Sequence, residues 1–385
     1  MQLQTPQISR LMLDVDRAMS IKYNTMVYEL QRRGEKVLVM SLGEAFFQIP
    51  LYPMDNLPAN AINHYSHSRG LPELRTRLCE YFQQEYDVPI DEEREILITA
   101  GSKIAIHMAL MAILNPGDEV LFPEPAWVSY SEQVKLCRGI PVGIPYDKTI
   151  AEYAPYITPR TRALIINNPH NPRGSVYSED ELLALLQLAR EHNLWLLSDE
   201  AYSDFVLDRS FISIGRLDRE KRHSIIFNSM SKNYGISGWR IGYLIGNAEI
   251  VDAVLRINEH LITCPATILE YYLARHFYDL LEVTKPQIRD LLLKRQQLSA
   301  YMDRIGLKYL PGTATFYFFV SIAPSKLGSE EFCTRLLNED LICIVPGVGY
   351  GASCDSFVRV SIGAATLEEN MHGLNKIKSL VDKTS

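Results

Sequence analysis

A lysine and an arginine stand eight residues apart in the segment SMSKNYGISGWRIGY, residues 229–243. Lys232 follows the apolar run HSIIF, where a buried strand is expected to end, and burial there favours a neutral, nucleophilic amine. Ser229, Ser231 and Arg240 carry donors of the kind that bind a phosphate monoester. An amine nucleophile beside phosphate donors indicates a lysine joined as an imine to a phosphorylated aldehyde, which is the arrangement of pyridoxal phosphate (PLP) enzymes.

The elements that would position these residues are short apolar runs that alternate with helical patterns between about residues 95 and 250. Near-continuous apolar strands that alternate with helices predict a mostly parallel sheet covered by helices on both faces. The expected strands are 95–99, 118–122, 163–167, 194–198 and 224–228, and the expected helices are 102–114, 128–136 and 179–192. The fold class is therefore α/β.

Polar side chains follow four of these predicted strands. Gly101, Ser102 and Lys103 come after the first strand, and 168–171 after the third. Asp199 and Tyr202 come after the fourth, and 229–232 after the fifth. Ligands of open α/β sheets bind outside the carboxyl ends of the strands. We therefore expect all four clusters to meet at one site.

The pattern changes after about residue 285. A long charged helix is expected over 283–304 and a closing helix over 366–381. The runs 314–322, 342–346 and 356–362 are typical of antiparallel strands in a second, smaller α+β domain. We expect the first forty residues to join it and to flank the cleft. The predicted division is a large domain, 45–285, and a small domain made of 1–44 and 286–385.

Composition limits the class of protein. The 385 residues are 47% apolar and 22% charged with a net charge of −7, and no Lys/Arg-rich run appears, which argues against nucleic-acid binding. We see no signal peptide and no membrane span. The six cysteines lack metal-ligand spacing, so we expect no metal and reduced thiols in the cytoplasm.

Seven motifs in order resemble those of the fold type I, PLP-dependent aminotransferases of class I/II, the aspartate aminotransferase-like superfamily. The resemblance runs from about residue 35 to residue 370. The segments are YSHSRGLPELR (65–75), TAGSK (99–103), NPGDEVLFPEPAWVSY (115–130), NNPHNPRG (167–174), SDEAYSDF (198–205), SMSKNYGISGWRIGY (229–243) and FVRVSIG (357–363). The resemblance implies amino-group transfer from an L-amino acid to a 2-oxo acid in a ping-pong cycle, with PLP as the cofactor.

The resemblance also implies roles for three catalytic residues. Lys232 would hold PLP as the internal aldimine and then shuttle a proton. Asp199 would keep the pyridine nitrogen protonated, which makes the ring an electron sink. Tyr202 would donate a hydrogen bond to the phenolic oxygen of the cofactor, together with Asn171.

Further residues would bind the cofactor according to the same resemblance. Gly101, Ser102 and Lys103 would offer backbone N–H groups to the phosphate at a helix start, beside Ser229, Ser231 and Arg240. Trp127 would stack on the pyridine ring. Tyr65 would reach the phosphate of the neighbouring subunit, which implies a homodimer with shared active sites.

The substrate α-carboxylate needs a planar, bidentate donor, and Arg359 matches the position that the family uses. Asn171 and the backbone N–H of Gly43 would orient the same carboxylate.

Several questions stay open at this level. The same residues would also serve β- or γ-elimination, replacement or decarboxylation, and the amino donor, the acceptor and the pathway are not specified. The sequence does not say which Asn-Pro bond of 167–174 is cis. It reads Gly-Glu-Ala-Phe-Phe at 43–47 where the family usually has Gly-Glu-Pro-Asp-Phe. That change either alters a loop beside the substrate side chain or is neutral.

Overall fold

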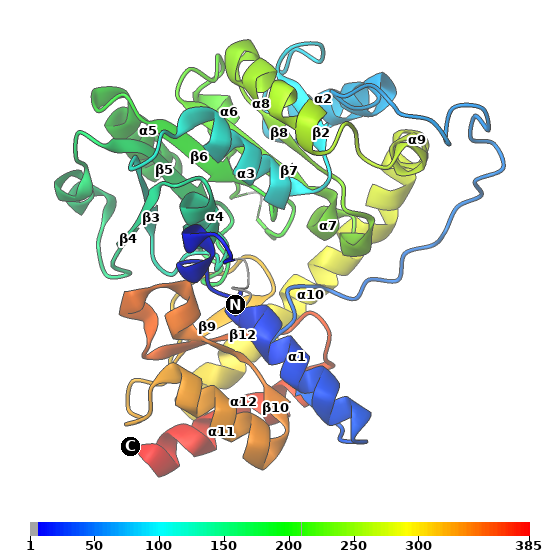
Figure 1. Ribbon diagram of the computed structural model, residues 1–385. Helices are drawn as coiled ribbons and strands as arrows, with labels where there is room; N and C mark the ends of the chain where they lie inside the picture. Colours follow the sequence, from blue (N-terminus) through cyan, green and yellow to red (C-terminus); the bar gives the residue numbers. More distant parts are fainter. Residues whose placement is uncertain (1–6, 209) are drawn as a thin grey trace, which may run out of the picture.

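A seven-stranded sheet forms the centre of the larger part of the molecule in a computed structural model that describes residues 7–208 and 210–385 (Figure 1). In sheet order the strands are β2 (Ile96–Thr99), β8 (Gly242–Ile245), β7 (Ser224–Ser229), β6 (Trp195–Asp199), β5 (Thr161–Asn167), β3 (Glu119–Pro123) and β4 (Ile140–Ile144). All pairs are parallel except those of β8, which is antiparallel to both its neighbours. The predicted mostly parallel α/β sheet is confirmed.

Two strands of this sheet, β4 and β8, were not predicted. The run of β4, Ile-Pro-Val-Gly-Ile, contains both a proline and a glycine, and its first residue is 40% exposed at the sheet edge. Strand β8 is short and lies inside the phosphate-donor segment. Because β8 is antiparallel to β2 and to β7, those two strands run in the same direction, and their carboxyl ends lie at one edge.

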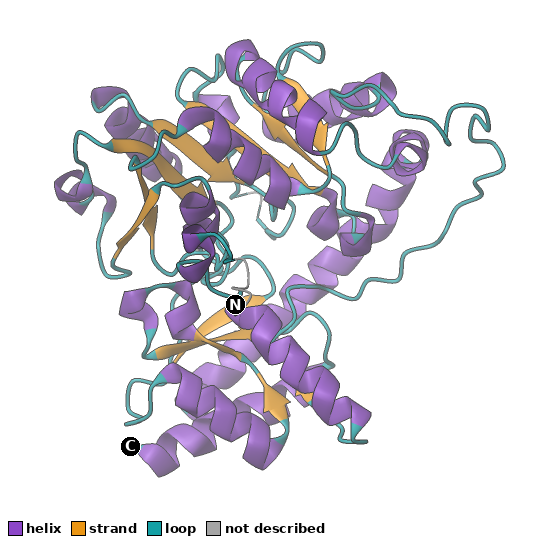
Figure 2. Cartoon of the chain, in the orientation of Figure 1, coloured by secondary structure: helices purple, strands orange, loops and turns teal. Residues whose placement is uncertain are grey.

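Helices cover both faces of the sheet, as Figure 2 shows. Alternate residues of each strand face opposite layers: Leu164 and Ile166 lie in one apolar cluster, and Ala163 and Ile165 lie in the other. The first cluster includes side chains of α2 (Pro72–Tyr86), α5 (Glu179–Glu191), α6 (Ile214–Leu217) and α9 (Thr267–Arg275). The second includes side chains of α3 (Ser102–Ile113), α4 (Tyr130–Leu136) and α8 (Ala248–Leu261). This two-sided burial explains the continuous apolar runs of the strands.

The smaller part contains a three-stranded antiparallel sheet in the order β11 (Val345–Pro346), β12 (Phe357–Ser361) and β9 (Tyr317–Ser321). The prediction of one antiparallel strand over 342–346 was wrong. That run divides into β11 and β10 (Ile342–Cys343), and β10 pairs in parallel with β1 (Leu38–Val39) near the chain start. Such a pairing depends on a strand three hundred residues away, which local alternation cannot reveal.

Helices of the smaller part are α1 (Met19–Arg32), α10 (Phe277–Ile305), α11 (Ser329–Asp340) and α12 (Leu367–Thr384). Residues 7–40 contact this part through β1 and through Tyr23, which lies in the same apolar cluster as Leu336. Helix α10 begins six residues before its expected start and continues through Pro286. It crosses the predicted boundary at residue 285 without a break, and the domain division stays a prediction.

Short helices complete the chain: α7 (Met230–Asn233) and the 3-10 turns Arg10–Leu13, Ile150–Glu152, Ala154–Tyr156, Ser237–Trp239, Gly347–Tyr350 and Ala352–Cys354. None of the helices in the described part of the chain is both long and apolar enough to cross a lipid bilayer.

Candidate active site

A cavity of about 500 Å³ lies at the carboxyl edge of the large sheet. Side chains from both parts of the molecule line it, including Arg359 of β12 and Ser20 and Asn24 of α1. Of the residues predicted to form the site, it is lined by Gly43, Ser102, Lys103, Trp127, Asn171, Asp199, Tyr202, Ser229, Ser231, Lys232, Arg240 and Arg359. The structure therefore brings together four strand ends of one sheet and one strand of another.

Lys232 lies on the single helical turn α7, directly after β7. The Ser229 hydroxyl caps this turn by accepting a hydrogen bond from the Ser231 N–H at 3.1 Å. The Lys232 amine donates to the Gly43 carbonyl, and among the described residues no carboxylate lies within ion-pair distance of it. Burial, with the nearby positive charges of Arg359 and Arg240, lowers the pKa of Lys232 to about 8. The lowered pKa makes the neutral, nucleophilic form of the amine more accessible near neutral pH than it is for an exposed lysine.

One end of the cavity is rich in hydrogen-bond donors. Arg240 donates to the Ser231 hydroxyl at 3.2 Å, and the first N–H groups of α3 have no partner within their own helix. Gly101, just before α3, has a positive φ of 92°, and a Cβ there would collide with the Arg240 guanidinium. The glycine therefore permits the arginine to lie against the helix start. This arrangement of donors suits a phosphate monoester.

Asp199 occupies the end of β6. It is 7% exposed, and its two carboxylate oxygens accept from the Tyr130 hydroxyl at 2.7 Å and from the Ala201 N–H at 3.2 Å. Burial raises the pKa of Asp199 to about 6, although both hydrogen bonds oppose that rise. The carboxylate is still ionised at neutral pH, so it can hold a positive charge placed beside it.

Tyr202 and Asn171 lie side by side in the wall of the cavity. The Asn171 amide lies 3.4 Å from the Tyr202 hydroxyl, which also shares a 3.0 Å hydrogen bond with the hydroxyl of Tyr317. The Asn171 side-chain oxygen is buried and has no partner among the described residues. An orphaned buried acceptor costs free energy, which a donor on a bound group would recover.

Arg359 is 3% exposed and donates to the Ser41 carbonyl at 2.6 Å. Its guanidinium carbon lies 4.6 Å from the centre of the Tyr317 ring. No carboxylate of the described chain pairs with it, and its Nε is buried without an acceptor. A buried guanidinium without a counter-ion is a strong site for an anion that brings two oxygens.

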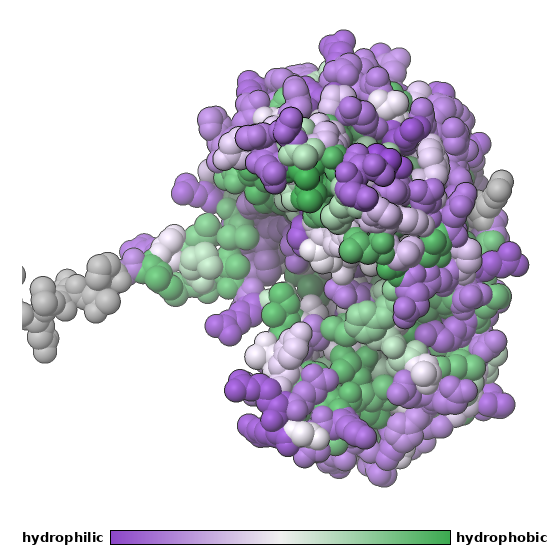
Figure 3. Space-filling model, turned by 90° about the vertical axis from the view of Figure 1, so that its right-hand side faces the viewer, coloured by the Kyte–Doolittle hydropathy of each residue, from purple (hydrophilic) through white to green (hydrophobic). Residues whose placement is uncertain are grey.

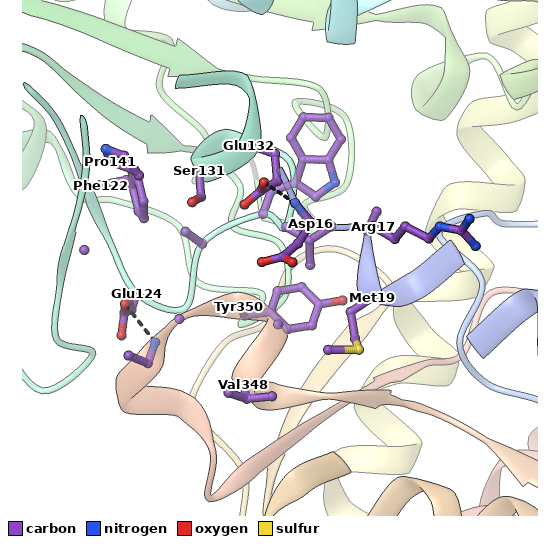
Figure 4. A pocket seen from close by; sticks show the side chains of 18 of the residues that line it. Asp16, Arg17, Met19, Phe122, Glu124, Ser131, Glu132, Pro141, Val348 and Tyr350 are labelled. Carbon is purple, nitrogen blue, oxygen red and sulfur yellow. Dashed lines mark hydrogen bonds between the residues drawn. The ribbon is translucent and has the colours of Figure 1, made fainter. Parts of the chain in front are cut away.

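A second cavity of about 780 Å³ adjoins the site and shares Trp127 with it (Figure 4). Figure 4 shows Asp16 and Met19 of the N-terminal segment opposite Val348 and Tyr350. The Asp16 N–H donates to Glu132 at 2.8 Å, which holds the segment against α4. Residues 16–19 therefore line this cavity together with residues of both parts of the molecule.

Two predicted residues lie outside the first cavity. Gly101 supports it through Arg240 as described above, and Tyr65 is 85% exposed on a loop. The unusual loop at 43–47 also leaves the cavity after Glu44: Phe46 is 61% exposed, and Phe47 stacks on Phe205 with 6.3 Å between ring centres. Both Asn-Pro bonds of 167–174 are cis, as is Glu124-Pro125.

The sequence analysis missed two residues, Tyr130 and Tyr317. Tyr130 orients Asp199, and its ring meets that of Trp127 edge to face at 5.3 Å, three residues along the chain. Tyr317 lies on the same face of the small sheet as Arg359, because Arg359 pairs with Phe319, two residues further on. No local pattern marked Tyr317, because the first four residues of β9 are all buried and its register with β12 is set by pairing. Nothing local signalled the Tyr130 contact.

Comparison with known proteins gives consistent matches. The family model described as aminotransferase class I and II matches residues 48–377. The aromatic-amino-acid aminotransferase 2 of Thermococcus litoralis is 32% identical over 91% of this chain and 94% of its own length. The aspartate/prephenate aminotransferase of Thermus thermophilus is 32% identical over 94% and 96%. A solved structure of aspartate aminotransferase from Thermus thermophilus with maleate superposes with a TM-score of 0.90, at 29% identity, over 98% of this chain and 100% of that one.

Proposed function

Because this chain belongs to the family of class I and II aminotransferases, we propose that it uses PLP, held in the 500 Å³ cavity, with Lys232 as the covalent partner. The protein is an aminotransferase: it moves an amino group from an amino acid to a 2-oxo acid. One observation carries the proposal. Lys232 and Arg359, which have no carboxylate partner among the described residues, face one cavity with Asp199, beside a cluster of phosphate donors.

The residues fit this cofactor chemically. Serine hydroxyls, the Arg240 guanidinium and the start of α3 suit the phosphate, and Asp199 suits a protonated ring nitrogen. The orphaned oxygen of Asn171 and the Tyr202 hydroxyl are polar groups for the substituents of the ring. When bound, PLP supplies an aldehyde that takes up the amino group and a ring that withdraws electrons from the substrate Cα.

The chain's own residues would do the rest. The Lys232 amine, in its neutral form, would accept the proton from the substrate Cα and hold it for return, because its lowered pKa lies near neutral pH. Asp199, held by Tyr130, keeps a positive charge on the ring side of the cavity. Arg359 fixes the α-carboxylate with its two parallel N–H groups, and Trp127 excludes water from one ring face. The alternative reactions on PLP have no observation in their favour.

The names of the relatives suggest a substrate class. Aspartate, prephenate and aromatic amino acids appear among their substrates by name, so we propose acidic and aromatic amino acids as the first donors to test. For the protein from cells rich in vitamin B6, we expect a visible absorbance that these donors bleach, with one equivalent of 2-oxo acid formed.

Three outcomes would contradict this proposal. A colourless protein would show that PLP is not its cofactor. Borohydride trapping on a side chain other than Lys232 would show that Lys232 is not the covalent partner. Release of ammonia in the absence of an acceptor oxo acid would show that the reaction is an elimination and not an amino-group transfer.

We further propose a cytoplasmic homodimer in which Tyr65 serves the partner's site. The loop of Tyr65 is held outward, because the Ser66 N–H donates to Thr267 at 3.1 Å and the Leu71 N–H to Glu270 at 2.9 Å. On this side of the molecule apolar surface gathers near the middle, as Figure 3 shows. Leu51 and Tyr65 are 71% and 85% exposed. Exposed apolar surface of this kind supports a protein interface.

A further inference from the structure

A group of buried polar side chains lies next to the active site but lines none of its cavity. Its members come from three places in the fold: Tyr81 and Tyr86 of α2, Ser203 and Asp204 after the catalytic-site turn, and Asn228 and Asn233 around α7. The roles proposed above use none of these six residues. Polar groups are costly to bury unless they are paired, so a connected group at this place needs a physical account.

The Ser203 hydroxyl is the centre of the group. It accepts from the Asn228 side-chain amide at 3.1 Å and from the Asn233 side-chain amide at 2.9 Å. All three residues are at most 2% exposed, so water does not substitute for these bonds. Asn228 and Asn233 stand immediately before and after the segment 229–232. One oxygen atom therefore ties down both ends of the segment that carries Lys232.

The protons of the group can be assigned. Tyr81 and Tyr86 both donate to the same carboxylate oxygen of Asp204, Tyr81 at 2.6 Å. A phenol has one proton, so with Asp204 ionised the Tyr86 oxygen is left to accept. The Ser203 hydroxyl lies 3.0 Å from it and donates there. Both lone pairs of Ser203 are then free for the two asparagine amides, and every polar atom of Ser203's side chain is used.

Ser203 also follows Tyr202 directly in the chain. Its hydroxyl thus joins the turn that carries Asp199 and Tyr202 to the turn that carries Lys232. Resting on the proposed function, we propose that Ser203 is a positioning residue, which fixes the Lys232 amine relative to Tyr202 through Asn228 and Asn233. The Tyr86–Asp204 pair orients the Ser203 proton away from the two amides.

A positioning role for Ser203 has consequences that a purely stabilising role would not have. Without the Ser203 hydroxyl the 229–232 segment loosens at both ends, and water reaches the Lys232 nitrogen. A nitrogen that is less desolvated is protonated more easily, so its titration moves to higher pH. Misplacement of the amine by a fraction of an ångström lowers turnover while the carboxylate site at Arg359 stays intact.

The test compares Ser203→Ala with a matched control, Ser224→Ala, in the cofactor-loaded full chain. Ser224 is 0% exposed and begins β7, the strand whose other end leads into α7, and its hydroxyl donates to Asp218 at 2.9 Å. Both variants lose one buried hydroxyl. The measurements are the pH midpoint of the visible absorbance, kcat, and KM for one amino acid, with melting temperature as the stability readout.

We expect both variants to melt at lower temperature. Only Ser203→Ala should raise the pH midpoint, by about half a unit, and lower kcat by about tenfold, with KM changed by less than about twofold. Ser203→Thr, which keeps the hydroxyl, should restore the midpoint. Tyr86→Phe keeps the Ser203 hydroxyl but removes the acceptor of its proton, together with one donor to Asp204, and should give a smaller shift in the same direction. If Ser203→Ala does not fold, the Tyr86→Phe variant still tests the positioning role of Ser203.

An unshifted midpoint and unchanged kcat in Ser203→Ala and Tyr86→Phe would overturn the positioning role and leave the proposed function standing. Wild-type protein without a visible chromophore would instead remove the proposed function itself.

Discussion

The two ends of β7 each lie beside a lysine withdrawn from solvent, and the two lysines have opposite surroundings. Before the strand, Lys221 is 1% exposed and donates to Glu95 at 2.8 Å, to the Pro89 carbonyl at 2.8 Å and to the Arg219 carbonyl at 3.0 Å. All three of its donor positions and its charge are satisfied. After the strand, Lys232 contacts one carbonyl, that of Gly43, and no carboxylate pairs with it within the described chain.

The difference separates stability from function. A buried charge with full hydrogen bonding holds elements together: Lys221 joins the connection before β7 to the start of β2. A buried amine with too few partners lowers its own pKa and stays reactive. Arg359 and the Asn171 oxygen repeat the second pattern at the same edge of the molecule. These polar groups with too few partners line the cavity where a ligand would meet them.

Replacement of Lys232 gives the largest expected effect. Lys232→Ala should lower kcat by about 10⁴-fold, the upper range for loss of a positioned acid–base group, and should keep its fold and its bound cofactor. Single-turnover kinetics with one amino acid measures this, and circular dichroism checks the fold. Near-normal turnover in this variant would remove Lys232 from the chemistry.

Lys221→Met is the control for the opposite end of β7. It breaks a buried, charged hydrogen-bond set and should cost about 3 kcal/mol of unfolding free energy, with kcat per folded molecule unchanged. If folded Lys221→Met protein had no turnover, the distinction between a stabilising lysine before β7 and a functional lysine after it would be wrong.

Arg359 tests the same contrast in a second buried cation. Arg359→Ala should raise KM for every amino acid tested by roughly 10- to 100-fold, the loss of about 1.5–3 kcal/mol for a charged hydrogen bond. Arg359→Lys should recover only part of this, because an ammonium cannot bind a carboxylate with two parallel N–H groups. The measurement is KM for a panel of amino donors. If KM were unchanged for all of them, the α-carboxylate of the substrate would not bind to Arg359.

The smallest expected effect is a pH dependence of stability in cofactor-free protein. The folded-state pKa of Lys232, about 8, lies below the ordinary value of about 10.4. Between these values the unfolded chain binds the extra proton, so stability should rise with pH from about 8 to about 10. We expect a gain of no more than about 2 kcal/mol, because the amine faces an open cavity.

Urea unfolding across this pH range measures the effect, with Lys232→Met as the comparison. The variant should give a flatter profile than the wild type. Identical slopes in the two proteins would mean that the Lys232 amine is not desolvated.

Much of the fold was predictable because parallel strands that are buried on both faces consist of continuous apolar runs. The five predicted strands of the large sheet correspond to β2, β3, β5, β6 and β7. The expected helices 179–192 and 366–381 correspond to α5 and α12, and each begins with a capping box, Ser178 with Glu181 and Thr366 with Glu369. Strands β4 and β8 and the division of 342–346 were not predictable, since their pairing depends on distant partners rather than on local pattern.

The site divides in the same way. Residues at strand ends could be placed together in advance, because carboxyl ends of co-directional strands share one edge. Tyr130 lies 69 residues before Asp199, and Tyr317 lies 115 residues after Tyr202. Such contacts are made by packing between layers and between the two sheets, and neither residue type nor spacing announces them.

The amino-acid sequence alone determined the α/β class, the family and the side chains that can form an imine, bind a phosphate and bind a carboxylate. Only the folded arrangement decided which buried lysine is held by a carboxylate and which is left almost alone. The reason is that Glu95 and Gly43, the groups that meet Lys221 and Lys232, lie more than a hundred residues away in sequence. Partners at that separation are chosen by long-range packing, and the charge state of an amine follows from its partners.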